Sequence, residues 1–162
     1  MSQSPFAVVT FIAAPALLTN ASSVLALSTI NRMLCTRERM HELFNESEAG
    51  DQNDEERIRL TAVTDRVEKQ ATLLLTALHS IYLALAAFAS STLVTLLGAG
   101  VATFHGRPWV HGMAVIGLLL GFFGAGGLVL GCANLFQATQ LSLVNIRDEA
   151  ALIRERFAPA KK

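Results

Sequence analysis

The chain has 162 residues and no net charge, and only 16% of its residues are charged. Soluble domains carry about 25% charged residues, so this composition points away from a soluble protein. A neutral chain has no overall electrostatic attraction to nucleic acid, and we expect no nucleic-acid partner. The mean hydropathy of +0.44 favours a membrane protein instead.

The charged residues are segregated along the chain. Three stretches contain no Asp, Glu, Lys or Arg, namely residues 2–31, 71–105 and 108–146. Each is longer than the roughly 20 residues that cross a bilayer as a helix. Because a charge at the bilayer centre costs about 2.5–3.5 kcal/mol, we predict three transmembrane helices, with the lipid bilayer as a partner.

The first helix is predicted over residues 5–48, with a span at 6–28 and a polar arm after it. Ser4 and Pro5 form a typical helix start, and Gly50 follows the predicted end. A cleaved signal peptide is the alternative for this segment. The opening MSQSP lacks Lys and Arg, so we interpret the segment as a retained span.

The second helix is predicted over residues 53–104, with its polar arm first and its span at 78–103. Asn53 can cap this helix, and Glu56 completes a capping box. Five residues of the arm recur at alternating spacings of three and four: Leu60, Val63, Val67, Gln70 and Leu74. This spacing is typical of a coiled-coil seam, so we expect the arm to pack against another helix.

The third helix is predicted over residues 108–157, with its span at 110–133. Pro108 suits its first position, and Trp109 is a typical interfacial anchor. As a helix, residues 108–146 would extend about 58 Å, against about 30 Å of hydrocarbon. The helices must therefore leave the lipid. We predict an all-α membrane protein of one domain, whose helical extensions form a short cytoplasmic bundle.

The basic residues indicate the orientation. Of the thirteen Lys and Arg residues, only Arg107 lies on the side of the turn between the second and third helices. Cytoplasmic segments carry the excess of Lys and Arg. We therefore expect the N-terminus outside, the C-terminus in the cytoplasm, and a location in the plasma membrane.

The segment GLLLGFFGAGGLVLG, residues 117–131, is dense in glycine. It lacks the third glycine of a dinucleotide fingerprint and the lysine of a phosphate-binding loop, so we predict no cofactor. Small residues three or four apart favour close helix packing in lipid. The partner is either the second helix or a neighbouring copy. The predicted packing residues are Gly117, Gly121, Gly124, Gly127 and Gly131.

Neutral polar residues form two stripes at helical spacing. One stripe, in the first helix, contains Asn20, Ser23 and Asn31; the other, in the third helix, contains Asn134, Gln137 and Asn145. An interhelical hydrogen-bond network would explain them. A hydrated vestibule or pore lined by amides and hydroxyls would explain them as well, and both interpretations stay open.

Few residues suggest chemistry. His79 lies in the second span, and an ionisable residue inside a membrane is a functional candidate, although the headgroup level also fits its position. His105 and His111 flank the outer turn without acidic or cysteine neighbours, so we predict no metal site. Cys35 and Cys132 are predicted to be reduced thiols.

The acidic residues alternate with basic ones in the polar arms, as they do on solvated helix faces. We find no combination of nucleophile, base and acid, and we expect no enzymatic activity. The favoured function is a self-associating scaffold or an accessory subunit of a larger membrane complex. The alternative is a homo-oligomeric channel or transporter with a neutral polar vestibule.

The segment FIAAPALLTNASSVLALSTINRMLCTRERMHEL, followed by RVEKQATLLLTAL, resembles an uncharacterised family of small bacterial three-span membrane proteins. The shared features are an apolar first span that ends in an Asn-Arg pair, here Asn31-Arg32, and an Arg-containing helix after it. The resemblance implies three spans and a bacterial inner-membrane location. It implies no catalytic residue.

Overall fold

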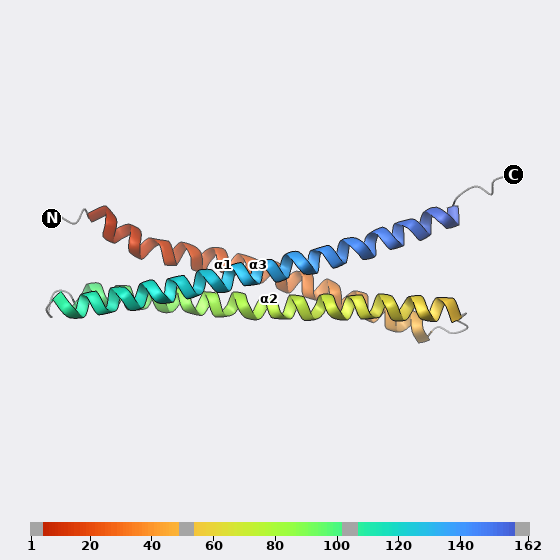
Figure 1. Cartoon of the computed structure of the whole chain (residues 1–162), viewed down its shortest axis with the longest axis horizontal. Helices are drawn as coiled ribbons and strands as arrows, with labels where there is room; N and C mark the ends of the chain where they lie inside the picture. Colours follow the sequence, from red (N-terminus) through yellow and green to blue (C-terminus); the bar gives the residue numbers. More distant parts are fainter. Residues whose placement is uncertain (1–4, 49–53, 102–106, 158–162) are drawn as a thin grey trace.

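The computed structural model describes residues 5–48, 54–101 and 107–157, and it is entirely helical over these ranges (Figure 1). The helices are α1 (Pro5–Glu48), α2 (Asp54–Val101) and α3 (Arg107–Phe157). The predicted all-α fold is confirmed. The predicted cap Asn53 and His105 lie outside the described residues, as do positions 102–104.

All three helices are long and apolar enough to cross a membrane. At 1.5 Å per residue they extend about 66, 72 and 77 Å, so each is about twice as long as a bilayer core is thick. Large apolar side chains cover their outer surfaces, including Phe122 and Phe123, which are 80% and 81% exposed. Exposed apolar surface on this scale suits contact with lipid and identifies the helices as candidate spans of a multi-pass membrane protein.

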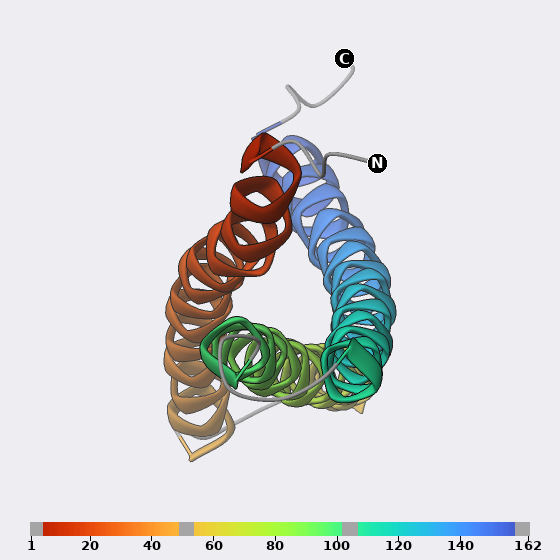
Figure 2. The ribbon, with the colours of Figure 1, turned by 90° about the vertical axis from the view of Figure 1, so that its left-hand side faces the viewer.

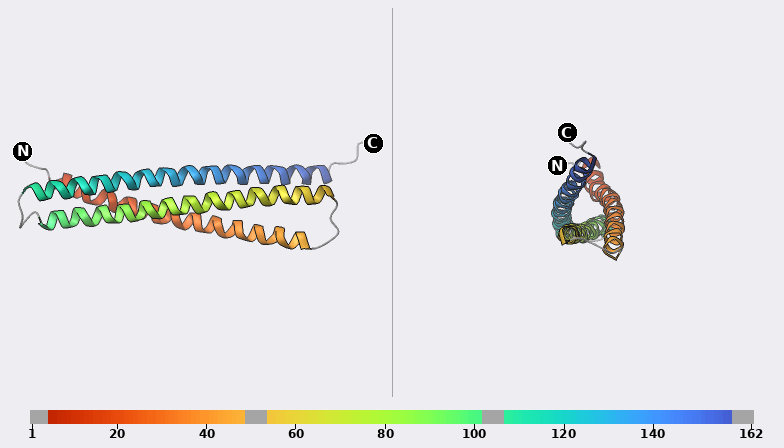
Figure 3. Two further views of the ribbon diagram at one scale, coloured as in Figure 1. Left: turned by 60° about the horizontal axis from the view of Figure 1, so that its bottom comes forward. Right: turned by 90° about the vertical axis from the view of Figure 1, so that its right-hand side faces the viewer.

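α2 is the central helix of the molecule. α3 lies antiparallel beside α2 over most of its length, and α1 packs on another side of α2 (Figures 1 and 3). α1 and α3 scarcely touch each other. Viewed from one end, the three helices outline a triangle, with α2 along one side and α1 and α3 along the other two (Figure 2).

The uncharged parts of the three helices gather at one end of the molecule. The end of α2 and the start of α3 are neighbours there, the start of α1 lies at the same end but set apart from them, and the charged parts lie at the opposite end (Figures 1 and 2). Along the chain, α1 runs from uncharged to charged, α2 from charged to uncharged, and α3 from uncharged to charged. Because successive helices are antiparallel, their uncharged parts come to the same end.

The packed face of α2 follows one pattern from end to end. Val67 and Leu74 are buried, and Leu60, Val63 and Gln70 of the predicted seam are partly buried. Beyond the seam, the same spacing of three and four continues through the apolar half, with a repeat typical of antiparallel helix bundles. The buried residues there are Ala77, Ile81, Ala84, Phe88, Ser91, Thr95 and Gly98.

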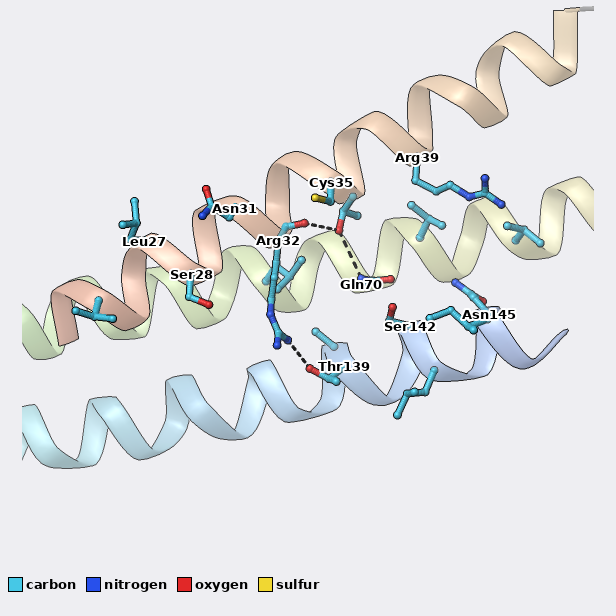
Figure 4. Close-up of a pocket in the computed structure, with 18 residues that line it drawn as sticks. Leu27, Ser28, Asn31, Arg32, Cys35, Arg39, Gln70, Thr139, Ser142 and Asn145 are labelled. Carbon is cyan, nitrogen blue, oxygen red and sulfur yellow. Dashed lines mark hydrogen bonds between the residues drawn. The ribbon is translucent and has the colours of Figure 1, made fainter. Parts of the chain in front are cut away.

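Some contacts between the helices extend into their charged parts. Leu43 of α1 is buried, and Arg66 of α2 forms an ion pair with Asp148 of α3. α1 and α3 remain apart on the open side of the molecule, where Arg32 of α1 reaches Thr139 of α3 (Figure 4).

Candidate functional site

The glycine-rich face of α3 lies against α2 of the same chain. Gly124 faces the buried ring of Phe88, and a Cβ at residue 124 would lie 2.8 Å from two ring carbons. At Gly131 a Cβ would lie 2.8 Å from Cγ1 of Ile81. Contacts this short leave no room for a side chain. Glycine at these two positions therefore allows the backbones of α2 and α3 to approach each other closely.

One hydrogen bond crosses this interface. The hydroxyl of Ser91 donates to the carbonyl oxygen of Gly117 at 2.7 Å, and both residues are buried. A Cβ at Gly117 would lie 2.8 Å from Cγ2 of Thr95. At Gly121 the nearest atom is the Ser91 hydroxyl oxygen at 3.6 Å, and at Gly127 it is the Ser80 carbonyl oxygen at 3.3 Å. All five predicted glycines therefore face α2.

The open side between α1 and α3 contains a groove of about 820 Å³. We call it the α1–α3 groove. Its walls come from residues 24–39 of α1 and 138–146 of α3, and its floor comes from residues 63–74 of α2 (Figure 4). It begins in the uncharged part of α1 and ends in the charged part.

Hydrogen bonds connect the three helices around this groove. Arg32 extends from α1 towards α3, and its Nη1 donates to Oγ1 of Thr139 at 2.6 Å (Figure 4). The Thr139 hydroxyl in turn donates to the carbonyl oxygen of Leu135. On the floor, the amide of Gln70 approaches the hydroxyl of Thr36 at 3.5 Å. Arg32 is thereby held across the open side of the molecule.

The groove is electropositive. Arg32 and Arg39 line it, and no Asp or Glu does so among the described residues. Arg39 forms an ion pair with Glu42 at 2.9 Å. Within the described ranges, no ion pair joins Arg32 to a carboxylate. The guanidinium of Arg32 therefore carries the charge that is not balanced inside the groove.

The groove also contains an unsatisfied acceptor. The side-chain oxygen Oδ1 of Asn145 is buried and has no hydrogen-bond partner. A buried acceptor without a donor costs about 1–3 kcal/mol, so a donor from outside the chain would be favourable there. Asn145 lies on the α3 wall, beyond Ser142 from Thr139 (Figure 4).

The two predicted polar stripes are divided by the fold. Asn20 and Ser23 are exposed on α1, outside the groove lining, and Gln137 is exposed on α3. Asn31 and Asn145 line the α1–α3 groove. Asn134 is partly buried. The hydroxyl of Ser23 donates to the carbonyl of Thr19 in its own helix, so it provides no interhelical link.

The sequence placed Arg32 in the Asn31-Arg32 pair and among the basic residues that indicate orientation, but it did not predict a groove there. A signal was present, because Arg32, Cys35 and Arg39 are spaced by three and four residues and so share one face of α1. The partner Thr139 is 107 residues away in the chain and could not be inferred from spacing.

The remaining candidates are not brought together. His79 and His111 are exposed. Cys35 is an exposed free thiol in the groove wall, and Cys132 is an exposed free thiol of α3. In the part of the chain that the structure describes, no three His, Cys, Asp or Glu residues are grouped as metal ligands.

The comparison with protein families agrees with the resemblance noted above. The DUF2721 family, described as proteins of unknown function, matches residues 12–147. This range includes every residue of the α1–α3 groove and the glycine-rich face of α3. Searches of curated proteins and of solved structures gave no significant match. Because the match covers most of the chain, the protein belongs to the DUF2721 family.

Proposed function

We propose that the protein is a non-enzymatic membrane scaffold that associates with further copies of itself through the exposed surface around Asn20 in the first half of α1. The observation that supports this proposal is the exposure of Asn20 in the uncharged half of α1. An amide that faces lipid has no partner for its hydrogen bonds. In a symmetric dimer, two Asn20 side chains can each donate to and accept from the other.

The test of self-association is the substitution Asn20→Leu. An interhelical hydrogen bond in a membrane contributes about 0.6–2 kcal/mol, and 1.4 kcal/mol is a factor of ten in affinity. We therefore expect the protein-to-lipid ratio at which half of the protein is associated to be roughly tenfold higher for this variant than for the wild type. The measurement is the oligomer fraction in liposomes, by single-molecule photobleaching over a dilution series.

The matched control is Leu17→Ala, which changes an exposed apolar residue one turn away and leaves Asn20 intact. We expect its oligomer fraction to equal that of the wild type. A wild-type protein that is monomeric at every dilution would contradict the proposal. Ion flux through wild-type proteoliposomes that is lost in Asn20→Leu would instead support the alternative, a homo-oligomeric channel or transporter.

We further propose that the protein lies in a bacterial inner membrane with its N-terminus outside and its charged end in the cytoplasm. The support is the clustering of Lys and Arg in the helix ends opposite Arg107. The charged ends of the helices would then form the surface available to a larger cytoplasmic or membrane complex.

Orientation is tested by cysteine labelling after Cys35 and Cys132 have been replaced by serine. We expect Ser2→Cys to react with a membrane-impermeant maleimide in intact cells. Asp51→Cys and Lys161→Cys should react only after permeabilisation. Labelling of Asp51→Cys in intact cells would show that the orientation is reversed.

A further inference from the structure

We propose that the α1–α3 groove binds an anionic phospholipid through its headgroup phosphate. Arg32 is the ligand of the phosphate, and the acyl chain lies along the apolar end of the groove. The proposal does not depend on self-association, because the groove is formed by one chain and Asn20 does not line it. The volume, position, charge and hydrogen bonding of the groove support it.

The volume and position match a small amphiphile. The groove's 820 Å³ lies within the range of about 300–1,000 Å³ that is typical of small-molecule sites. One end is lined by Val24 and Leu27, which belong to the uncharged stretch of α1. Arg32 is the first charged residue after that stretch. The groove thus joins hydrocarbon depth to headgroup depth, as one phospholipid does.

The charge of the groove matches an anion. The hydrogen bond to Thr139 uses one of the five N–H donors of the Arg32 guanidinium, and the others remain for a ligand. Guanidinium groups bind phosphate through paired hydrogen bonds, and basic sites between transmembrane helices bind anionic headgroups. No carboxylate among the described residues lines the groove to oppose an anion.

The unsatisfied acceptor suggests the kind of headgroup. Oδ1 of Asn145 is buried without a partner, and it lies about two turns along α3 from Thr139, on the polar side of Arg32. This oxygen is enclosed by protein atoms, so the Asn145 side chain must turn towards the groove for a headgroup hydroxyl attached to the phosphate to supply the missing donor. We therefore assign the groove to an anionic phospholipid with a hydroxyl-bearing headgroup, of which phosphatidylglycerol is the simplest example.

The first test measures lipid binding by native mass spectrometry of detergent-solubilised protein. We expect phosphatidylglycerol to bind at least tenfold more tightly than phosphatidylcholine, whose headgroup has no net charge and no hydrogen-bond donor. Arg32→Gln should bring the two lipids to within about twofold. Arg37→Gln removes the same charge from an exposed position of the same helix outside the groove, and it should leave the preference unchanged.

The second test uses the wild-type chain and so does not depend on the folding of a variant. Cys35 lines the groove, and Cys132 lies outside it. Phosphatidylglycerol should slow alkylation of Cys35 by N-ethylmaleimide about fivefold or more, whereas alkylation of Cys132 should not change. Phosphatidylcholine should protect neither thiol.

Three results would overturn the proposal. Equal affinity of the wild type for the two lipids would show that the groove does not select a headgroup. Equal protection of Cys35 by glycerol 3-phosphate would identify a site for a soluble anion. Protection that rises with protein concentration, without added lipid, would show that a second copy fills the groove.

Discussion

Replacing Gly124 by alanine is expected to lower the free energy of unfolding by about 1–3 kcal/mol, the usual cost of overpacking a core. The new Cβ would lie 2.8 Å from two carbons of the Phe88 ring, and this ring is fully buried. The ring cannot move away without displacing its own neighbours. The measurement is the midpoint of thermal unfolding in detergent, followed by circular dichroism.

The matched control is Gly126→Ala, two residues further along the same helix. At Gly126 a Cβ would meet no heavy atom of the described structure within 4 Å. Because alanine has a higher helix propensity than glycine by up to about 1 kcal/mol, this variant should be neutral or more stable. If Gly124→Ala and Gly126→Ala unfold at the same temperature, close packing between α2 and α3 is not what the glycines provide.

Larger side chains extend the comparison along the interface. Gly121→Leu should be destabilising, although alanine would fit there at 3.6 Å from the Ser91 hydroxyl oxygen. Gly124→Leu should be the most severe of the series. Leu119→Ala should have little effect, because Leu119 is more than half exposed. The ranking separates a packed interface from a general sensitivity of α3 to substitution.

Replacing Val67 by aspartate is expected to destabilise the protein by about 3–5 kcal/mol, the usual consequence of an unpaired buried charge. Val67 is 3% exposed, and it lies in the charged half of α2, outside the predicted span. A large effect would show that the helices remain packed on α2 beyond the lipid. The readout is expression level together with the thermal unfolding midpoint.

Ala62→Asp provides the control for Val67→Asp. Ala62 is exposed on the same arm of α2, so the substitution adds the same charge without burying it. Exposed substitutions usually change stability by less than about 0.5 kcal/mol. If Val67→Asp behaves like Ala62→Asp, the charged half of α2 is not packed as the structure describes.

The candidate spans and the helical class were predictable because their signal is local. Three uncharged stretches separated by charged segments indicate membrane helices whatever their arrangement. Each spanning segment must form its own backbone hydrogen bonds, because the bilayer core supplies no partner for them. The seam of α2 was predicted from Leu60 to Leu74 for a similar reason, because apolar residues there alternate with charged ones. Beyond Leu74 almost every residue is apolar or small. The same repeat continues there through Ala77 and Ser91 without any contrast that periodicity could detect.

The partners of each face depended on the tertiary structure. The glycine spacing indicated a close approach, but only the position of Phe88 identified α2 of the same chain as the neighbouring helix. The polar stripes had two open interpretations, and in the fold only part of each stripe, Asn31 and Asn145, lines the groove. Arg32 marked the edge of a span in the sequence, whereas its hydrogen bond to Thr139 depends on the positions of α1 and α3 on either side of the groove. Helical periodicity determines which residues of one helix share a face, but the side-chain packing of all three helices determines what that face meets.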